Sequence, residues 1–224
     1  MNSVWDIVGP IMVGPSSSHT AGAARLGKIA RYLSGEEIKE VVFELHGSFA
    51  KTYQGHGTDR ALVAGILGFE PSDFRLRNSF EFAKERHLLF SFVPTDLREE
   101  VHPNTVRFLI TTNSGKKVNI MGSSIGGGNI VINEIDGISV YFTGNNPILV
   151  TKHEDKPGVV ARLTSLLYER EINIATMRVL RLEDTDMATM YIELDNNKNS
   201  QGLLEQVHEI PGVEKALLLD KELS

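Results

Sequence analysis

Apolar residues recur at three- and four-residue spacing shortly after a glycine-proline turn near the start of the chain. This spacing is typical of one face of an amphipathic helix. Ser34-Gly35 follows the run and provides a stop signal, because glycine readily ends a helix. The pattern predicts a packed helix whose buried stripe contains Ala23, Ala24, Leu26, Ile29, Ala30 and Leu33.

A strand pattern follows this helix. Val41, Phe43 and Leu45 alternate with their neighbours, and the run stops at Gly47. We therefore predict a strand that delivers His46 to a loop.

A second helical run begins at Thr58-Asp59 and is capped by Gly68. Its apolar positions are Ala61, Leu62, Ala64, Ile66 and Leu67. His56 is expected just before this helix, as His19 is expected just before the first one.

The pattern changes to alternation between Thr105 and Phe142. Asn113-Ser114-Gly115 and Asp136-Gly137 are turn signals that separate the alternating runs. We predict a small antiparallel meander here, and hence an α+β fold for the first domain.

A turn-rich cluster, Gly144-Asn145-Asn146-Pro147, is the best candidate for a domain boundary. We assign residues 1–145 to a first domain and 148–224 to a second. The second domain has strand patterns at 149–151, 172–182, 187–194 and 213–219, with helical runs after Pro157-Gly158 and around Leu203. The order βαββαβ predicts a ferredoxin-like arrangement.

Composition narrows the functional classes. The length of 224 residues favours two domains, and a formal charge of −6 with no basic run argues against nucleic acid as the main partner. No apolar run approaches the ~20 residues that span a bilayer, and the N-terminus lacks a secretory signal pattern, so we expect a cytoplasmic protein. The chain contains no cysteine, which excludes disulfides, a cysteine nucleophile and any cluster held by thiolates of this chain. We expect no metal ligands in it.

The segment Gly14-Pro15-Ser16-Ser17-Ser18-His19-Thr20 carries the most candidate chemistry. The first N–H groups of a helix lack internal partners and lie at the positive end of its dipole, so a carboxylate or phosphate is expected to bind there with help from the hydroxyls. Helix capping is the alternative role for any one of these hydroxyls. Three consecutive serines exceed what one cap requires.

Four motifs in the first domain together carry a family resemblance: GPSSSHTAGAARLG, HGSFAKTYQGHGTDRA, HPNT and SSIGGGNI. The chain resembles the β chain of the bacterial two-subunit iron-sulfur L-serine dehydratases. The second domain, with HEDKPGVVARLTSLLYEREINIATMRV, resembles an ACT domain. The first domain also resembles the allosteric substrate-binding module of some phosphoglycerate dehydrogenases.

The resemblance implies an L-serine ammonia-lyase that converts L-serine to pyruvate and ammonia. It further implies a 4Fe-4S cluster that acts as a Lewis acid on the departing hydroxyl. Because this chain has no cysteine, the cluster is expected on a separate, cysteine-bearing α chain. The partners implied are that α chain, in a heterodimer, and L-serine. Self-association through the ACT-like domains is also expected.

The resemblance assigns roles to particular residues. His56, flanked by Gly55 and Gly57, is favoured as the base that removes the α-proton, with Thr58 or Asp59 orienting it, and His19 is the rival base. The substrate is expected to contact Ser16, Ser17, Ser18 and Thr20. A second anion-binding loop is expected at 123–129, with Ser124, Gly127 and Asn129 as substrate-binding residues.

In the ACT-like domain, the candidate effector-binding residues are Asp155, Pro157, Gly158 and Asn173. The resemblance to amino-acid-binding relatives implies that these positions form a pocket at a domain–domain interface. The alternative for this domain is that it binds nothing and pairs its sheet with that of another copy. The alternative for the whole chain is a stand-alone serine sensor that uses the same pockets without catalysis.

Overall fold

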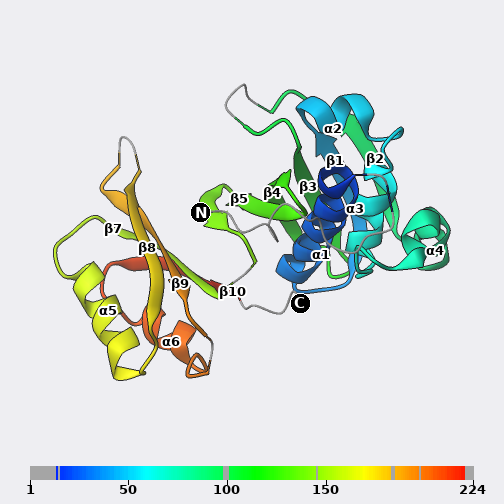
Figure 1. Ribbon diagram of the computed structural model, residues 1–224. Helices are drawn as coiled ribbons and strands as arrows, with labels where there is room; N and C mark the ends of the chain where they lie inside the picture. Colours follow the sequence, from blue (N-terminus) through cyan, green and yellow to red (C-terminus); the bar gives the residue numbers. More distant parts are fainter. Residues whose placement is uncertain are drawn as a thin grey trace. The chain divides into compact units, whose positions relative to one another are not determined.

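The computed structural model describes residues 14, 16–97, 101–144, 146–182, 185–196 and 198–219 (Figure 1). Pro15 of the serine-rich motif and Asn145 of the predicted linker lie outside the described residues. The chain forms two compact units that divide between Thr143 and Gly144.

The first unit is built on a six-stranded sheet with the order β2-β1-β3-β4-β5-β6. β1 and β2 are parallel, and every other neighbouring pair is antiparallel. The strands are β1 (Ile38–Leu45), β2 (Leu89–Pro94), β3 (Thr105–Thr112), β4 (Lys117–Gly126), β5 (Asn129–Ile135) and β6 (Ile138–Phe142).

Helices cover one face of this sheet, with α1 and α3 lying side by side against it (Figure 1). The buried face carries Phe43 of β1 opposite Phe108 of β3, and Phe108 is in turn opposite Ile120 of β4. The helical elements are η2 (Ser17–Gly22), α1 (Ala23–Ser34), α2 (Gly47–Thr52), α3 (Thr58–Ile66), η3 (Phe74–Asn78) and α4 (Ser79–Glu85).

The first two predicted helices, the first strand and the antiparallel meander are confirmed. The α+β class is also confirmed. Gly35 ends α1 with φ 70°, the left-handed conformation expected of a glycine stop. β2, the short helix α2 and η3 were not predicted from the sequence. It also placed His19 before its helix, whereas His19 lies within η2, a single turn of π-helix that leads directly into α1.

Two glycines allow α1 and α3 to pack closely. A Cβ on Gly65 would lie 2.1 Å from the carbonyl oxygen of Ala24, and one on Gly27 would lie 2.5 Å from the carbonyl oxygen of Leu62. Both obstacles are backbone atoms, so neither moves aside as a flexible side chain would. The two helix backbones therefore approach more closely at this crossing than any larger residue permits.

The second unit has the element order β7-α5-β8-β9-α6-β10 and the strand order β10-β7-β9-β8. The predicted βαββαβ arrangement is confirmed. Leu163 of α5 and Val207 of α6 pack with Leu149, Met190 and Ile192 on one face of the sheet. The elements are β7 (Ile148–Glu154), α5 (Val159–Glu169), β8 (Ile174–Arg181), β9 (Met187–Leu194), α6 (Leu203–His208) and β10 (Val213–Leu219).

Within the part of the chain that the structure describes, no helix has the length and apolar character needed to cross a membrane.

Candidate functional site

The serine-rich turn begins with a hydrogen-bonded cap. Ser16 Oγ accepts a hydrogen bond from the backbone N–H of His19 at 3.1 Å, and the Ser16 carbonyl accepts one from the N–H of Thr20 at 2.9 Å. Ser16 therefore has the capping role that the sequence analysis left open. The side chains of Ser17 and Ser18 have no hydrogen-bond partner among the described residues, and both are half-buried.

The imidazole of His19 is enclosed by groups from three segments. Its Nε2 lies 3.1 Å from Ser48 Oγ, and its Nδ1 lies 3.4 Å from Ser16 Oγ. The ring packs edge-on against Phe49 and lies 4.9 Å from the ring of His56, between centroids. Ser48 and Phe49 belong to α2, a helix that the sequence analysis did not find.

The HPNT motif holds α2 in this position. The Pro103 carbonyl accepts hydrogen bonds from the backbone N–H groups of Ser48 and Phe49, at 2.8 and 3.3 Å. Gly47 has φ 57°, and a Cβ there would lie 2.7 Å from the same carbonyl oxygen. The Asn104 carbonyl accepts from the N–H of Ser124 at 2.9 Å, so one short segment ties the start of α2 to the end of β4.

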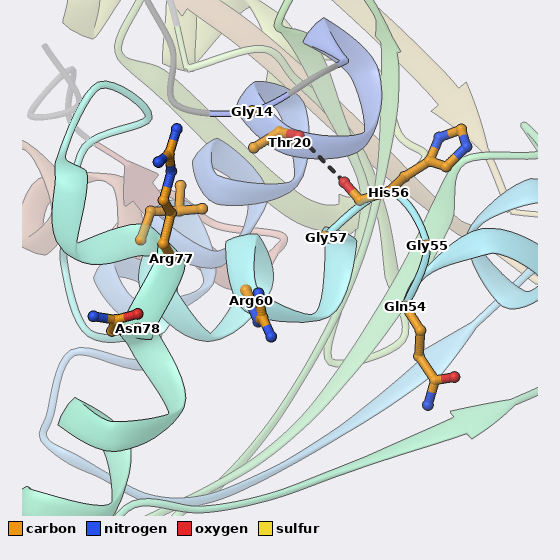
Figure 2. A pocket seen from close by; sticks show the side chains of 10 residues that line it. Gly14, Thr20, Gln54, Gly55, His56, Gly57, Arg60, Arg77 and Asn78 are labelled. Carbon is orange, nitrogen blue, oxygen red and sulfur yellow. Dashed lines mark hydrogen bonds between the residues drawn. The ribbon is translucent and has the colours of Figure 1, made fainter.

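His56 lies in the turn between α2 and α3, and its side chain is exposed. Its backbone is fixed on both sides, because its N–H donates to the Thr52 carbonyl at 3.0 Å and its carbonyl accepts from Thr20 Oγ1 at 3.4 Å. Figure 2 shows the second of these bonds. Within the described part of the chain, the ring nitrogens of His56 have no hydrogen-bond partner.

The prediction that Thr58 or Asp59 orients His56 is wrong in this structure. Asp59 Oδ1 accepts a hydrogen bond from the N–H of Arg60 at 2.7 Å, within its own helix. Burial raises the pKa of the Asp59 carboxyl. Thr58 is buried, and its hydroxyl has no partner among the described residues. His56 is positioned through its backbone and by the His19 ring instead.

The expected anion-binding loop at 123–129 is largely strand. β4 runs to Gly126 and β5 begins at Asn129, so only Gly127 and Gly128 form the turn. Their φ values are 61° and 81°, as a two-residue hairpin requires. The Gly128 carbonyl accepts a hydrogen bond from Arg25 Nη1 at 2.9 Å. The loop prediction is therefore wrong in its geometry.

Ser124 lies nevertheless beside the serine-rich turn. A Cβ on Gly22 would be 2.0 Å from Ser124 Oγ, which shows how closely β4 approaches η2. The Ser124 hydroxyl is buried and has no partner among the described residues. Asn129, at the far end of the hairpin turn, is exposed.

A cleft of about 360 Å³ lies beside the His56 turn (Figure 2). The sequence analysis did not find it, because η3 carries two of its polar residues and that element was not predicted. The lining includes Thr20, Gln54, His56, Arg60, Arg77 and Asn78.

Burial is the main cause that lowers the pKa of His19, and repulsion from His56 lowers it further. The neutral imidazole is therefore favoured at this position at neutral pH. A neutral ring with one nitrogen as acceptor can orient a hydroxyl or receive a proton. The described residues contain no group of three or more side chains suited to hold a metal ion.

The predicted effector residues of the second unit do not meet within one copy. Asp155 follows β7, and its Oδ2 lies 2.6 Å from Nε of Arg181, at the end of β8. Asn173 precedes β8, and its Nδ2 donates to Asp195 Oδ2 at 2.6 Å, at the opposite end of that strand. Pro157 and Gly158 lie with Asp155, since Gly158 precedes α5. The four residues are therefore compatible with a shared pocket only at an interface between domains, which is where the resemblance places it.

Two family models match the chain. The model described as serine dehydratase beta chain matches residues 3–85, and the model described as AHAS small subunit-like ACT domain matches residues 149–215.

Relatives extend the likeness over most of the chain. The chain is 43% identical to an L-serine dehydratase beta chain of Peptoniphilus asaccharolyticus, over 86% of this chain and 87% of the relative. It is 40% identical to a probable L-serine dehydratase beta chain of Bacillus subtilis, over 94% of each. It is also 29% identical to a D-3-phosphoglycerate dehydrogenase of Methanocaldococcus jannaschii, over 88% of this chain and 37% of that enzyme.

Proposed function

Because this chain belongs to the family of serine dehydratase beta chains, we propose that it is the β subunit of a two-chain enzyme that converts L-serine to pyruvate and ammonia. One observation carries the proposal. Two imidazoles, His19 and His56, lie 4.9 Å apart beside the serine-rich turn, although they come from separate segments. An elimination of this kind requires a base and a group that holds the substrate carboxylate.

The residues of this chain do not fit an iron-sulfur cluster, because such clusters are held by cysteine thiolates and the chain has no cysteine. We therefore assign the cluster to a cysteine-bearing α chain. When bound there, a cluster would supply Lewis-acid chemistry for the departing hydroxyl. What this chain itself contributes is the base and the substrate contacts.

In this proposal His56 accepts the α-proton of L-serine on a ring nitrogen. Its exposure supports the assignment, as does the lack of a ring partner among the described residues. Both ring nitrogens of His19, by contrast, already face serine hydroxyls. His19 therefore acts as a positioning residue that packs against the His56 ring.

The substrate carboxylate is assigned to the hydroxyls of Ser17 and Ser18. Ser16 caps the turn, and Thr20 donates to the His56 carbonyl, so these two hydroxyls have structural roles. Ser17 and Ser18 keep their hydroxyls available among the described residues. Ser124 is a second candidate, since its hydroxyl is unpartnered there.

The test is anaerobic turnover of L-serine to pyruvate by this chain alone and then together with the cysteine-bearing α chain. We expect activity only in the mixture. His56→Asn should lower kcat by about a hundredfold or more, the usual contribution of a general base. His87→Asn is the matched control, because His87 is exposed and has φ 55°, a conformation that asparagine tolerates.

Serine binding by this chain without turnover in the mixture would contradict the enzyme and favour the serine sensor. Unchanged turnover in His56→Asn would contradict the base assignment alone.

We further propose that the second unit pairs with another copy of itself through β8. This strand is an edge of its sheet, and Ala175 to Arg181 are all exposed. Met177, Val179 and Leu180 are 41%, 40% and 50% exposed, which is unusual for large apolar residues in a strand. An edge strand with exposed apolar side chains is suited to pairing with a second strand.

A further inference from the structure

The cleft beside the His56 turn carries two arginines whose side chains have no acceptor among the described residues. Arg60 is on α3 and Arg77 is on η3, and both line the cleft. Neither side chain has a hydrogen bond or ion pair among the described residues. The other described arginines of this unit each donate to a protein acceptor: Arg25, Arg31, Arg75, Arg86 and Arg107.

The carboxylates near these arginines are already engaged. Asp59 precedes Arg60, and its Oδ1 accepts a hydrogen bond from the backbone N–H of Arg60 itself. Burial raises the pKa of the Asp59 carboxyl and the Arg60 charge lowers it less, but no ion pair is formed between the two side chains. Asp73 caps η3 and is bound by the Arg75 side chain. The described residues that line the cleft include the amide side chains of Gln54 and Asn78 and no aspartate or glutamate. The cleft therefore combines two positive charges with neutral donors, in a chain whose net charge is −6.

We propose that this cleft binds the anionic group of a small metabolite, a carboxylate or a phosphate, through Arg60 and Arg77. Guanidinium groups bind both anions with paired hydrogen bonds. The volume of about 360 Å³ is within the range of pockets for small ligands. The described lining contains no carboxylate that would pair with an ammonium group. The site therefore favours anions that lack an ammonium group over amino-acid zwitterions such as L-serine.

The ligand would contact the segment that carries His56. Gly55, His56 and Gly57 line the cleft, as does Thr20, whose hydroxyl donates to the His56 carbonyl (Figure 2). A ligand bound in the cleft would therefore contact the backbone segment that positions His56. Ser17 and Ser18, whose hydroxyls are assigned to the serine carboxylate, are not among the described lining residues of the cleft. The anion site proposed here does not depend on the proposed reaction.

The experiment is an NMR titration of the full chain with inorganic phosphate, with pyruvate as a carboxylate probe, and with L-serine. We expect the amide signals of Gly55 and Gly57 and the side-chain Nε–H signals of Arg60 and Arg77 to shift with phosphate, pyruvate or both. L-serine should leave the two arginine signals unchanged. A response to phosphate alone identifies a phosphate-bearing ligand, and one to pyruvate alone a carboxylate.

Arg60→Gln and Arg77→Gln should each weaken the binding of the responding probe about tenfold or more, because a hydrogen bond to a charged group is lost. Both side chains are exposed, so the fold should be retained. Lys84→Gln is the control, since it removes one exposed positive charge of the same unit outside the cleft. The proposal is overturned if neither anion shifts these signals, or if Lys84→Gln weakens binding as much as the two arginine variants.

Discussion

His19 is expected to titrate below the ordinary histidine value. Burial lowers its pKa, and repulsion from His56 lowers it further. The unfolded chain therefore binds more protons than the folded one below pH 6.5, the unperturbed value. The stability that the neutral ring contributes is present above pH 6.5 and is lost as the pH falls through the folded pKa. The measurement is an NMR titration of the His19 ring, with an expected midpoint below 6.5.

His56→Gln should raise that midpoint, because it removes the smaller of the two causes. The midpoint should stay below 6.5, since burial remains. A midpoint at or above 6.5 in the unmodified chain would contradict the prediction. His153 of the second unit has a pKa lowered first by burial as well, so its stability contribution has the same sign.

Ser48 is expected to matter for turnover although it is not assigned to the substrate. Its hydroxyl lies 3.1 Å from His19 Nε2 and holds the ring against His56. Ser48→Ala should lower kcat of the assembled enzyme about fivefold, the effect of one net hydrogen bond of ~1 kcal/mol, with a smaller change in KM. Steady-state kinetics would measure both constants.

Ser48→Thr keeps the hydroxyl and should restore most of kcat. If the threonine variant were as slow as the alanine variant, the loss would reflect packing of α2 rather than the bond to His19.

The residues of the candidate site could be predicted from the sequence, but most of their hydrogen-bond partners could not. Ser16 is three residues from His19, so its capping role follows from local helix rules. Ser48 is 29 residues away, and its contact with His19 depends on how α2 is held by the Pro103 carbonyl. No local pattern encodes that contact. Asp59 does not orient His56 as expected, because its carboxylate accepts a hydrogen bond from the backbone N–H of Arg60 in its own helix.

At the scale of elements, the crossing of α1 and α3 should not tolerate a methyl group. Gly65→Ala should lower the free energy of unfolding by about 2 kcal/mol or more, since overpacking against a fixed backbone exceeds the ~1 kcal/mol that alanine gains in helix propensity. Urea denaturation monitored by circular dichroism would measure the change. The control is Gly55→Ala, because the nearest atom to a Cβ there is 3.8 Å away.

Gly55→Ala should change the unfolding free energy by less than about 1 kcal/mol. Equal stability of the Gly65→Ala and Gly55→Ala variants would mean that α1 and α3 can move apart at little energetic cost. That result would contradict the prediction.

Periodicity predicted the elements whose burial alternates or follows a helical stripe. β1 and β3 to β6 belong to this class, and so does α1. β2 was not predicted, because it is an edge strand that ends in Pro94 and its residues Leu89, Ser91 and Val93 are exposed. An anion-binding loop was predicted where the structure has a hairpin turn. A run of glycines permits many backbone conformations, and the pairing of β4 with β5 selects the turn.

At the scale of the molecule, the order of elements in the second unit predicted its sheet, whereas the effector pocket expected at a domain–domain interface stays a prediction. Asp155 and Asn173 lie on either side of α5, which carries the chain from one end of the sheet to the other. The order of elements along the chain specifies the topology. Which residues lie close together at the ends of the strands depends on the register of strand pairing. The candidate site follows the same logic, since His19 and His56 meet only once α2 and η2 are placed against the sheet.

The edge strand β8 offers the last test, at the level of assembly. Val179→Lys puts a charge among the exposed apolar residues of this edge, where pairing with a second copy would bury it. Sedimentation of the unmodified chain should give a mass larger than one copy, and Val179→Lys should shift it to a single copy. Tyr168→Lys is the matched control, because Tyr168 is 84% exposed and lies on α5 rather than on β8, and it should leave the mass unchanged. A mass unaffected by Val179→Lys would mean that copies associate elsewhere or not at all, and the exposed residues of β8 would then need another partner.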